Sequence, residues 1–254
     1  LITARQRDGK DRGDLMSQVV FAADEQGGMS KKQMRDELMT LIFAGHETTA
    51  HTLTWAWYLL ALNQDKVSKA RNEIDKTIGS RAIRVDDLRE LPYLEMCLKE
   101  SLRRLPAVWI YGREAQCDLR LGDYFFPKNS ILAVSPLAIG RNAKYFEEPM
   151  EFRPERWTRE FERQLPRGAY VPFAGGPRVC LGKQFALMEM KIVLGTLIQN
   201  VDINIVEDFE PDFLPELSLH PGERGMPMQV RFRDGAPVRT GDGGSRPAPR
   251  IHAA

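Results

Sequence analysis

A cysteine at position 180 lies in a glycine-rich loop, residues 173–182, with the sequence FAGGPRVCLG. Apolar residues recur every three or four positions directly after it, which predicts that a helix begins there. The positive end of a helix dipole favours the thiolate form of a cysteine. A single cysteine thiolate is one of the ligands that proteins give to a haem iron that activates O₂. The alternative is a buried, inert cysteine in a tight turn, which is common for free cysteines.

Two other ligand-binding motifs are excluded because residues that they require are missing. A phosphate-binding loop, G-x-x-x-x-G-K-[ST], would require glycine in place of Pro177 and serine or threonine in place of Gln184. A zinc motif, H-E-x-x-H, begins at His46, but the next histidine comes one residue too late, at His51. At about 100° per helical residue, the two histidines point about 140° apart. They therefore cannot share one zinc ion comfortably.

The segment AGHETT, residues 44–49, is a second candidate for chemistry, in a stretch with helical periodicity. Gly45 has no side chain, so a ligand can lie against the helix there. The Thr48 hydroxyl can both donate and accept a hydrogen bond, and Glu47 is an acidic neighbour, so the pair could relay a proton. The alternative is a kinked helix in which the Thr48 hydroxyl bonds to the main chain.

A carboxylate and a guanidinium, Glu100 and Arg103, lie three residues apart on a predicted helix. Such pairs are usually solvated and contribute only a few tenths of a kcal/mol, so the pair alone indicates little. Arg156, in the segment FRPERW of residues 152–157, could complete a Glu–Arg–Arg network. We expect this network to be structural rather than catalytic, and to hold the irregular residues 145–172 behind the cysteine loop.

The four patterns A-G-x-E-T, E-x-x-R, P-E-R-W and F-x-x-G-x-R-x-C-x-G together resemble the cytochrome P450 family, in the family's order, over about residues 15 to 233. The resemblance implies that Cys180 is the axial ligand of haem b, iron protoporphyrin IX. It implies that Thr48 and Glu47 are catalytic, in a proton relay. The other cofactor-binding positions that it implies are Arg178 and Arg113 at the propionates, Phe173 beside the sulfur, Gly182 under the porphyrin, and Ala44 and Gly45 on the oxygen-activation helix.

The chemistry that the resemblance implies is monooxygenation, in which one oxygen atom of O₂ enters a small apolar organic substrate. Electrons would come from a ferredoxin or a flavin reductase, docked on the cysteine side. The basic residues expected on that surface are Arg163, Arg167, Lys183 and Lys191. Two alternatives stay open: a haem-thiolate peroxygenase or isomerase, which needs no redox partner, and a non-catalytic haem-binding sensor or transport protein.

The elements that must position these residues are mainly helices, with small β-sheets. Helices are expected over residues 31–62, 64–78, 92–105 and 181–200, with helical turns after Asp86 and over 136–142. A capping box, Ser30 to Gln33, marks the start of the first. Short strands are expected over residues 108–111, 115–121, 124–126, 131–134, 202–205, 217–220 and 227–233.

Composition sets the remaining expectations. The chain has 254 residues, a net charge of +1 and three cysteines, so we expect no nucleic-acid partner and a cytoplasmic protein. Its most apolar run, residues 53–62, is too short to cross a membrane, although an anchor before Leu1 stays open. We expect residues 1–233 to be the C-terminal part of a P450 catalytic domain that lacks the N-terminal part of the fold and is inactive alone. Residues 5–14 read as a solvated charge run and 234–254 as a disordered tail.

Overall fold

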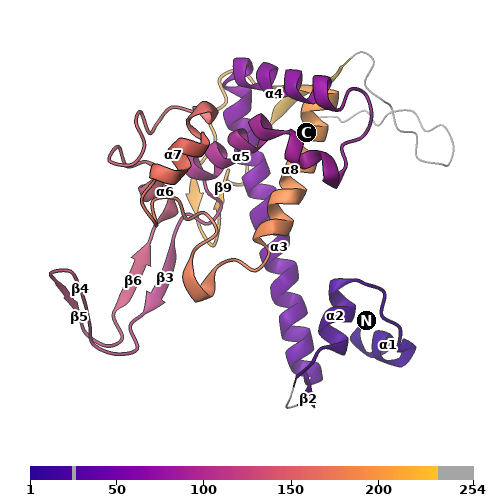
Figure 1. Cartoon of the computed structure of the whole chain (residues 1–254), viewed down its shortest axis with the longest axis vertical. Helices are drawn as coiled ribbons and strands as arrows, with labels where there is room; N and C mark the ends of the chain where they lie inside the picture. The colour runs from indigo at the N-terminus through magenta and orange to yellow at the C-terminus, as the bar shows by residue number, and fades with distance from the viewer. Residues whose placement is uncertain (25–26, 234–254) are drawn as a thin grey trace.

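The computed structural model describes residues 1–24 and 27–233. Helix α3 (Lys31–Ala61) runs through the length of the molecule, and α4 (Gln64–Thr77), α5 (Pro92–Arg104) and α8 (Lys183–Asn200) pack against its C-terminal half (Figure 1). The fold is therefore mainly helical with small sheets, as the sequence predicts. The expected tail, residues 234–254, lies outside the described residues.

The start of α3 follows the predicted capping box. The Ser30 hydroxyl accepts a hydrogen bond from the Gln33 N–H, and the Gln33 side chain accepts one from the Ser30 N–H at 2.9 Å. These bonds satisfy two of the N–H groups that every helix start leaves without a helical partner. The C-terminal half of the helix carries fully buried side chains such as Trp55 and Leu60, so it forms part of the core.

The core lies where the four long helices meet. Ile74 of α4, Leu94 of α5, and Leu194 and Ile198 of α8 are completely buried there. A Cβ added at Gly195 would lie 2.8 Å from the Ile83 side chain, so glycine permits the close approach of α8 to its neighbours. The 3₁₀-helix η1 (Val85–Glu90) closes this side of the core.

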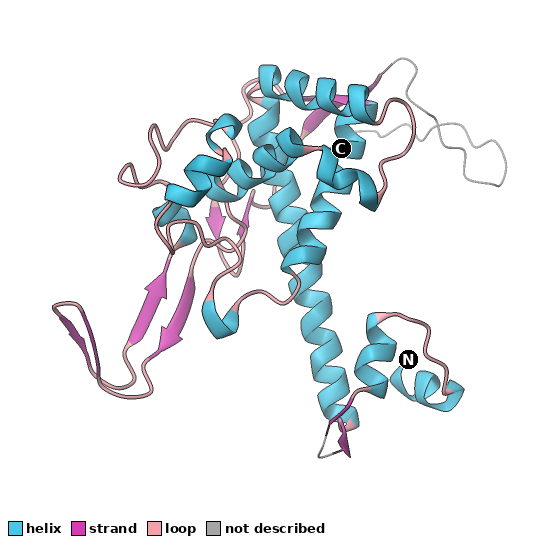
Figure 2. Ribbon diagram, in the orientation of Figure 1, coloured by secondary structure: helices cyan, strands magenta, loops and turns pink. Residues whose placement is uncertain are grey.

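The strands form two-stranded antiparallel ribbons, which Figure 2 shows beside the helices. The pairs in the described part of the chain are β1 (Ala23–Asp24) with β2 (Gly27–Gly28), β3 (Tyr111–Glu114) with β6 (Ile131–Val134), β4 (Leu119–Leu121) with β5 (Tyr124–Phe126), β7 (Val201–Ile205) with β10 (Met228–Phe232), and β8 (Leu214–Pro215) with β9 (Leu219–His220).

Several strands differ from their expected positions, and the expected strand 217–220 is reduced to Leu219–His220. Residues 108–110 are not a strand, and pairing begins at Tyr111, which faces Val134. The main chain there is held by side chains instead: the Ser135 hydroxyl donates to the Trp109 carbonyl at 2.8 Å, and the Trp109 indole donates to the Glu216 carbonyl at 2.9 Å. Only Leu119–Leu121 of the expected strand 115–121 is paired, as β4.

Helices also form in the N-terminal charge run and in residues 145–172, which were expected to be irregular. The N-terminal charge run contains most of α1 (Ile2–Asp8), followed by α2 (Leu15–Phe21), and Arg5 bridges the two by pairing with Asp14 at 2.6 Å. Residues 145–172 contain η2 (Pro154–Arg156) and α7 (Arg159–Gln164), and α6 (Pro136–Gly140) precedes them. Among the described helices, none is long and apolar enough to cross a membrane.

Candidate functional site

Cys180 lies in an exposed turn just before α8. Its N–H donates to the Phe173 carbonyl at 2.9 Å, which closes the loop. The helix itself begins at Lys183 with Gly182 at the N-cap position, two residues later than the periodicity predicts. The short 3₁₀-helix η3 (Gly176–Arg178) precedes the cysteine, and Gly176 has a φ of 68°, in the left-handed region that favours glycine. The Cys180 thiol therefore lies on a tight turn whose shape is set by a main-chain hydrogen bond and a glycine conformation.

The surface around this thiol is open and has few side chains. A Cβ built at Gly175 or at Gly182 would meet nothing within 4 Å, so the main chain is accessible to a flat ligand. Leu181 is 92% exposed and Phe185 is 61% exposed, so two large apolar side chains lie open close to Cys180 in the chain. Arg178 is exposed in the same turn and could pair with a carboxylate. One accessible sulfur, an open glycine surface, apolar neighbours and an arginine fit a haem with its propionates.

The second predicted arginine lies on the β3–β6 ribbon. Arg113 is exposed, donates from Nη1 to the Gly112 carbonyl at 2.8 Å, and lies 5.2 Å from the centre of the Tyr111 ring. No hydrogen bond joins it to the cysteine loop. Its position at a haem propionate therefore stays a prediction from the family resemblance.

The AGHETT segment is a regular part of α3. The Thr48 hydroxyl donates to the Ala44 carbonyl at 2.7 Å, which is the main-chain bond that we considered as the alternative to a relay. The segment lies within one unbroken α-helix. A Cβ built at Gly45 would meet nothing within 4 Å, so this stretch of the helix also offers an open surface.

Glu47 has two partners that the motif does not contain. The Ser218 hydroxyl donates to Glu47 Oε1 at 2.6 Å, and His51 Nδ1 lies 2.8 Å from the same hydroxyl. His51 Nδ1 is also 3.8 Å from Glu47 Oε1, one helical turn along α3. The i,i+4 spacing of Glu47 and His51 was a usable signal, but nothing local in the sequence connects either to a serine 171 residues away.

The predicted Glu–Arg–Arg network is formed and buried. Arg103 donates two hydrogen bonds to the Glu100 carboxylate, at 2.7 and 2.9 Å, and Arg156 Nε donates a third at 3.1 Å. Neither Glu100 nor Arg103 has an exposed side chain. The Trp157 indole donates to the same carboxylate at 2.9 Å, a fourth member that the motif search missed.

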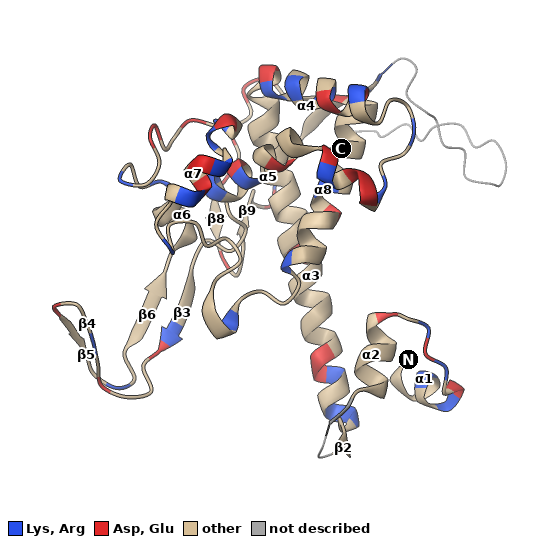
Figure 3. Cartoon of the chain, in the orientation of Figure 1, with Lys and Arg blue, Asp and Glu red and all other residues tan. Residues whose placement is uncertain are grey.

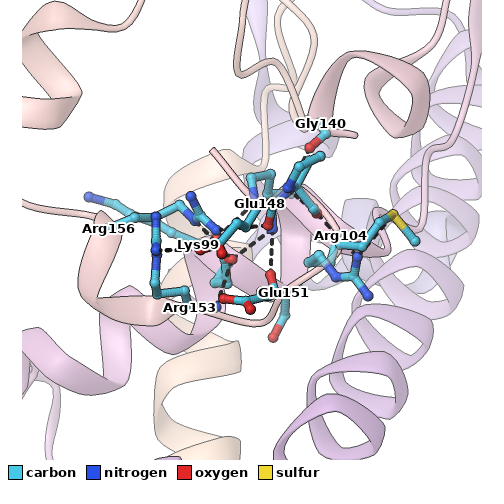
Figure 4. A network of polar contacts seen from close by, with 12 residues as sticks. Lys99, Arg104, Gly140, Glu148, Glu151, Arg153 and Arg156 are labelled. Atoms are coloured by element: carbon cyan, nitrogen blue, oxygen red, sulfur yellow. Dashed lines mark hydrogen bonds and ion pairs between the residues drawn. The ribbon is translucent and has the colours of Figure 1, made fainter. Parts of the chain in front are cut away.

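Arg103 and Arg156 also connect this network to the irregular segment through hydrogen bonds to main-chain carbonyls. Arg103 also donates to the carbonyls of Gly140 at 2.5 Å, Pro149 at 2.8 Å and Glu151 at 3.0 Å, and Arg156 donates to that of Glu147 at 2.9 Å (Figure 4). Burial lowers the pKa of Arg156, although the Glu100 charge opposes that shift. The contacts tie α5 to residues 140–157, which precede the cysteine loop.

One residue of the expected basic surface is misplaced. Lys191 is buried on α8, where its ammonium donates to the Leu88 carbonyl at 2.6 Å and to Glu95 Oε2 at 2.9 Å. It therefore cannot be part of a free docking surface. Arg163, Arg167 and Lys183 are exposed, and Figure 3 shows basic residues on α7 and in the turn that leads into α8.

Comparison with known proteins indicates the same family that the cysteine loop resembles. The family model described as Cytochrome P450 matches residues 3–227. Cyclooctatin synthase of Streptomyces melanosporofaciens is 36% identical over 227 residues, which cover 88% of this chain and 49% of that protein. Human Cytochrome P450 4V2 is 37% identical over 192 residues, 74% of this chain and 37% of that protein. The solved cytochrome P450DA heme domain superposes with a TM-score of 0.85 at 31% identity, covering 91% of this chain and 51% of that one.

The fold and the cysteine loop thus define a protein of the haem-thiolate class. The chain belongs to the cytochrome P450 family. It spans about half the length of the Streptomyces relative, 49%.

Proposed function

We propose that this chain forms the thiolate side of a P450 monooxygenase, which inserts one oxygen atom from O₂ into an apolar organic substrate. The observation that carries the proposal is the exposed Cys180 sulfur on an open glycine surface that leads into α8. Family membership supports the haem, because a cysteine thiolate is the ligand with which P450 proteins hold it.

The residues that would hold the haem lie on three elements. Cys180 would be the iron ligand, and Phe173 is fixed against the same turn by the bond from the Cys180 N–H. Arg178 and Arg113 would pair with propionates, and Gly182, with Ala44 and Gly45 on α3, would leave room for the flat ring. The haem, once bound, supplies the O₂-activating chemistry, and the thiolate donates electron density that favours O–O cleavage.

The part of this chain in the reaction is to move protons. Thr48 and Glu47 lie next to each other on α3, and the Glu47 carboxylate is held in place by Ser218. A carboxylate and a hydroxyl on adjacent residues supply the two kinds of group that a proton relay needs. The Thr48 hydroxyl keeps its oxygen lone pairs available as acceptors while it donates to the Ala44 carbonyl.

The intact Glu47–Thr48 pair favours monooxygenation over a peroxygenase or an isomerase, because those reactions need no proton delivery to dioxygen. Electrons would come from a ferredoxin or flavin reductase. The exposed Arg163, Arg167 and Lys183 favour an acidic donor on the cysteine side.

Isotope-labelled O₂ tests the proposal directly. The haem-loaded P450 domain that contains this chain, a reductase and NADPH are incubated with apolar probe substrates, because residues 1–233 are expected to be inactive alone, and the product is analysed by mass spectrometry. We expect one labelled oxygen atom per product and substrate-dependent NADPH consumption. Product formed only with hydrogen peroxide would indicate a peroxygenase, and haem binding without any product across the panel would favour a non-catalytic haem protein.

A further inference from the structure

A cluster of polar side chains connects Glu47 to a surface hollow that is lined in part by α3 and His220. Its members are Glu47 and His51 on α3, and Ser218 and His220 at the β8–β9 hairpin. The His51 and His220 rings are stacked, with centroids 5.6 Å apart and planes 24° apart. Ser218 is 2% exposed, so its hydroxyl has little access to solvent other than through these partners.

The hydrogen bonds in this cluster have a definite direction. A serine hydroxyl has one proton, and that of Ser218 is donated to Glu47 Oε1. The 2.8 Å contact with His51 Nδ1 is then a hydrogen bond only if His51 donates from Nδ1. The neutral ring therefore carries its proton on Nδ1, and its Nε2 is left as an acceptor.

Burial is the main reason that the His51 ring stays neutral near neutral pH. Burial lowers the pKa of His51, the Glu47 charge opposes this, and His220 and His46 lower it further. His220 in turn faces Glu216, at 3.5 Å from Nε2 to Oε2. A neutral imidazole can accept a proton at one nitrogen and release one at the other, which an imidazolium cannot do without first losing a proton.

The outer end of the cluster opens on a hollow of about 470 Å³. Both histidines line it, together with Thr54 and Trp57 of α3. Trp57 is buried, and its indole N–H has no hydrogen-bond partner within the described part of the chain. A buried N–H group on the wall of a hollow is normally satisfied by ordered water. The hollow is thus suited to hold water next to His51.

We propose that His51 and Ser218 form a proton relay from this hollow to Glu47. The inference rests on the proposed function, since it assigns a proton source to the Glu47–Thr48 pair. A proton from water binds to His51 Nε2, the Nδ1 proton passes to the Ser218 oxygen, and the Ser218 proton passes to Glu47 Oε1. One proton enters and one reaches the carboxylate, so the ring remains neutral with its proton on Nε2.

The relay is then reset without any further reactant. After Glu47 has released its proton toward Thr48, the Ser218 hydroxyl rotates back to the carboxylate. The ring returns to its starting tautomer by exchange with water in the hollow, which takes the proton from Nε2 and gives one back to Nδ1, so no net proton is gained or lost. Ser218 transfers the proton, and His220 positions the His51 ring. Neither is expected to touch the substrate or the haem.

The tautomer of His51 provides a test that does not depend on turnover. Nitrogen NMR on histidine-labelled protein, in the diamagnetic ferrous carbon monoxide form, distinguishes a ring protonated on Nδ1 from one protonated on Nε2. His51→Gln assigns the signal. We expect the Nδ1 form in the wild type and the Nε2 form in Ser218→Ala. An Nε2 tautomer in the wild type, or a tautomer unchanged in Ser218→Ala, would overturn the relay.

Two variants serve as matched controls. His46→Gln removes an exposed histidine from the same helix, and Thr54→Ala removes a hydroxyl that lines the same hollow and donates to the Ala50 carbonyl at 2.9 Å. Both should leave the His51 tautomer unchanged. A switch of tautomer in Thr54→Ala as large as that in Ser218→Ala would mean that the hollow, and not the Ser218 bond, fixes the ring.

Product formed per NADPH is the second readout. A positioned proton-transfer group typically contributes about 10²–10⁴-fold to the step that depends on it. We therefore expect His51→Gln and Ser218→Ala to lower coupling several-fold, with a larger solvent isotope effect, while the thiolate-type carbon monoxide spectrum stays normal. Normal coupling in both variants would overturn the relay alone. A wild type without the thiolate spectrum would overturn the proposed function, and the relay with it.

Discussion

Arg103 forms a two-point ion pair with Glu100 within one turn of α5, with Nε at 2.9 Å from Oε2 and Nη2 at 2.7 Å from Oε1. Both side chains are fully buried, so the pair is not one of the solvated ion pairs that helices often carry. The same guanidinium bonds to carbonyls of residues 140–151, and the same carboxylate accepts from Arg156 and Trp157. One buried pair therefore joins a core helix to the segment that precedes the cysteine loop.

We predict that Glu100→Gln lowers the free energy of unfolding by about 3–5 kcal/mol, because it leaves two buried guanidinium groups without their counter-charge. Urea unfolding followed by circular dichroism measures the change. Glu147→Gln is the control, since the Glu147 carboxylate is 81% exposed and pairs with Arg153 at the surface. It should cost less than about 1 kcal/mol. Equal losses in the two variants would contradict a central role for the buried carboxylate.

The Glu95–Lys191 pair predicts a pH dependence of stability. Burial alone would raise the pKa of Glu95, but the hydrogen bond and charge of Lys191, with those of Lys99, hold it below its usual value. The carboxylate therefore stabilises the fold above the unfolded pKa of about 4.3, and this contribution is lost as pH falls through the lower folded pKa. Between about pH 6 and pH 3, the wild type should lose more stability than Glu95→Gln. Glu90→Gln, at an exposed position, should follow the wild type.

Lys183 and Lys191 should respond differently to charge reversal. Lys183→Glu changes an exposed residue, so we expect slower electron transfer from an acidic donor, most strongly at low salt, with unchanged stability. Lys191→Glu places a second carboxylate beside Glu95 and leaves the Leu88 carbonyl without its donor, which costs about 1–3 kcal/mol or more in stability. Stopped-flow reduction and urea unfolding separate the two effects. A salt-independent rate that is unaffected by Lys183→Glu would argue against docking there.

Thr48→Ala should keep haem binding but reduce the product formed per NADPH, with the missing electrons appearing as peroxide. The hydroxyl is expected to handle protons, and among the described residues its one hydrogen bond is to the Ala44 carbonyl. Thr40→Ala is a matched control, because the Thr40 hydroxyl makes the same kind of bond, to Asp36 at 2.8 Å on the same helix. It should leave coupling unchanged. If Thr48→Ala also couples normally, the relay role of Thr48 is wrong.

The helices were predictable because their signals are local. The Ser30–Gln33 capping box and the spacing of apolar residues predict both ends of α3 to within one residue. Strand positions depend on partners far along the chain, so the start of β3 at Tyr111 is set by its pairing with Val134. The charge run at the N-terminus is largely exposed, as expected, but its helices were not predicted, because the Arg5–Asp14 pair that joins them depends on the fold.

The candidate site shows the same division. Cys180, Glu100 and Arg103 stand in compact motifs, whereas Ser218 reaches Glu47 only through the fold. Lys191 was misjudged because a lysine in a helix usually faces solvent. Its burial follows from a carbonyl on η1 and a carboxylate on α5 that meet it from two other elements.

The most direct test of the account is the reduced, carbon monoxide-bound absorption spectrum of the haem-loaded protein and of its Cys180→Ala variant. Cys97 is buried and Cys117 is exposed away from any motif, so Cys97→Ala and Cys117→Ala are the controls. We predict a band at the thiolate-ligated position in the wild type and in both controls, and its absence in Cys180→Ala. A thiolate band that survives Cys180→Ala would show that another residue ligates the iron, and would contradict the central claim.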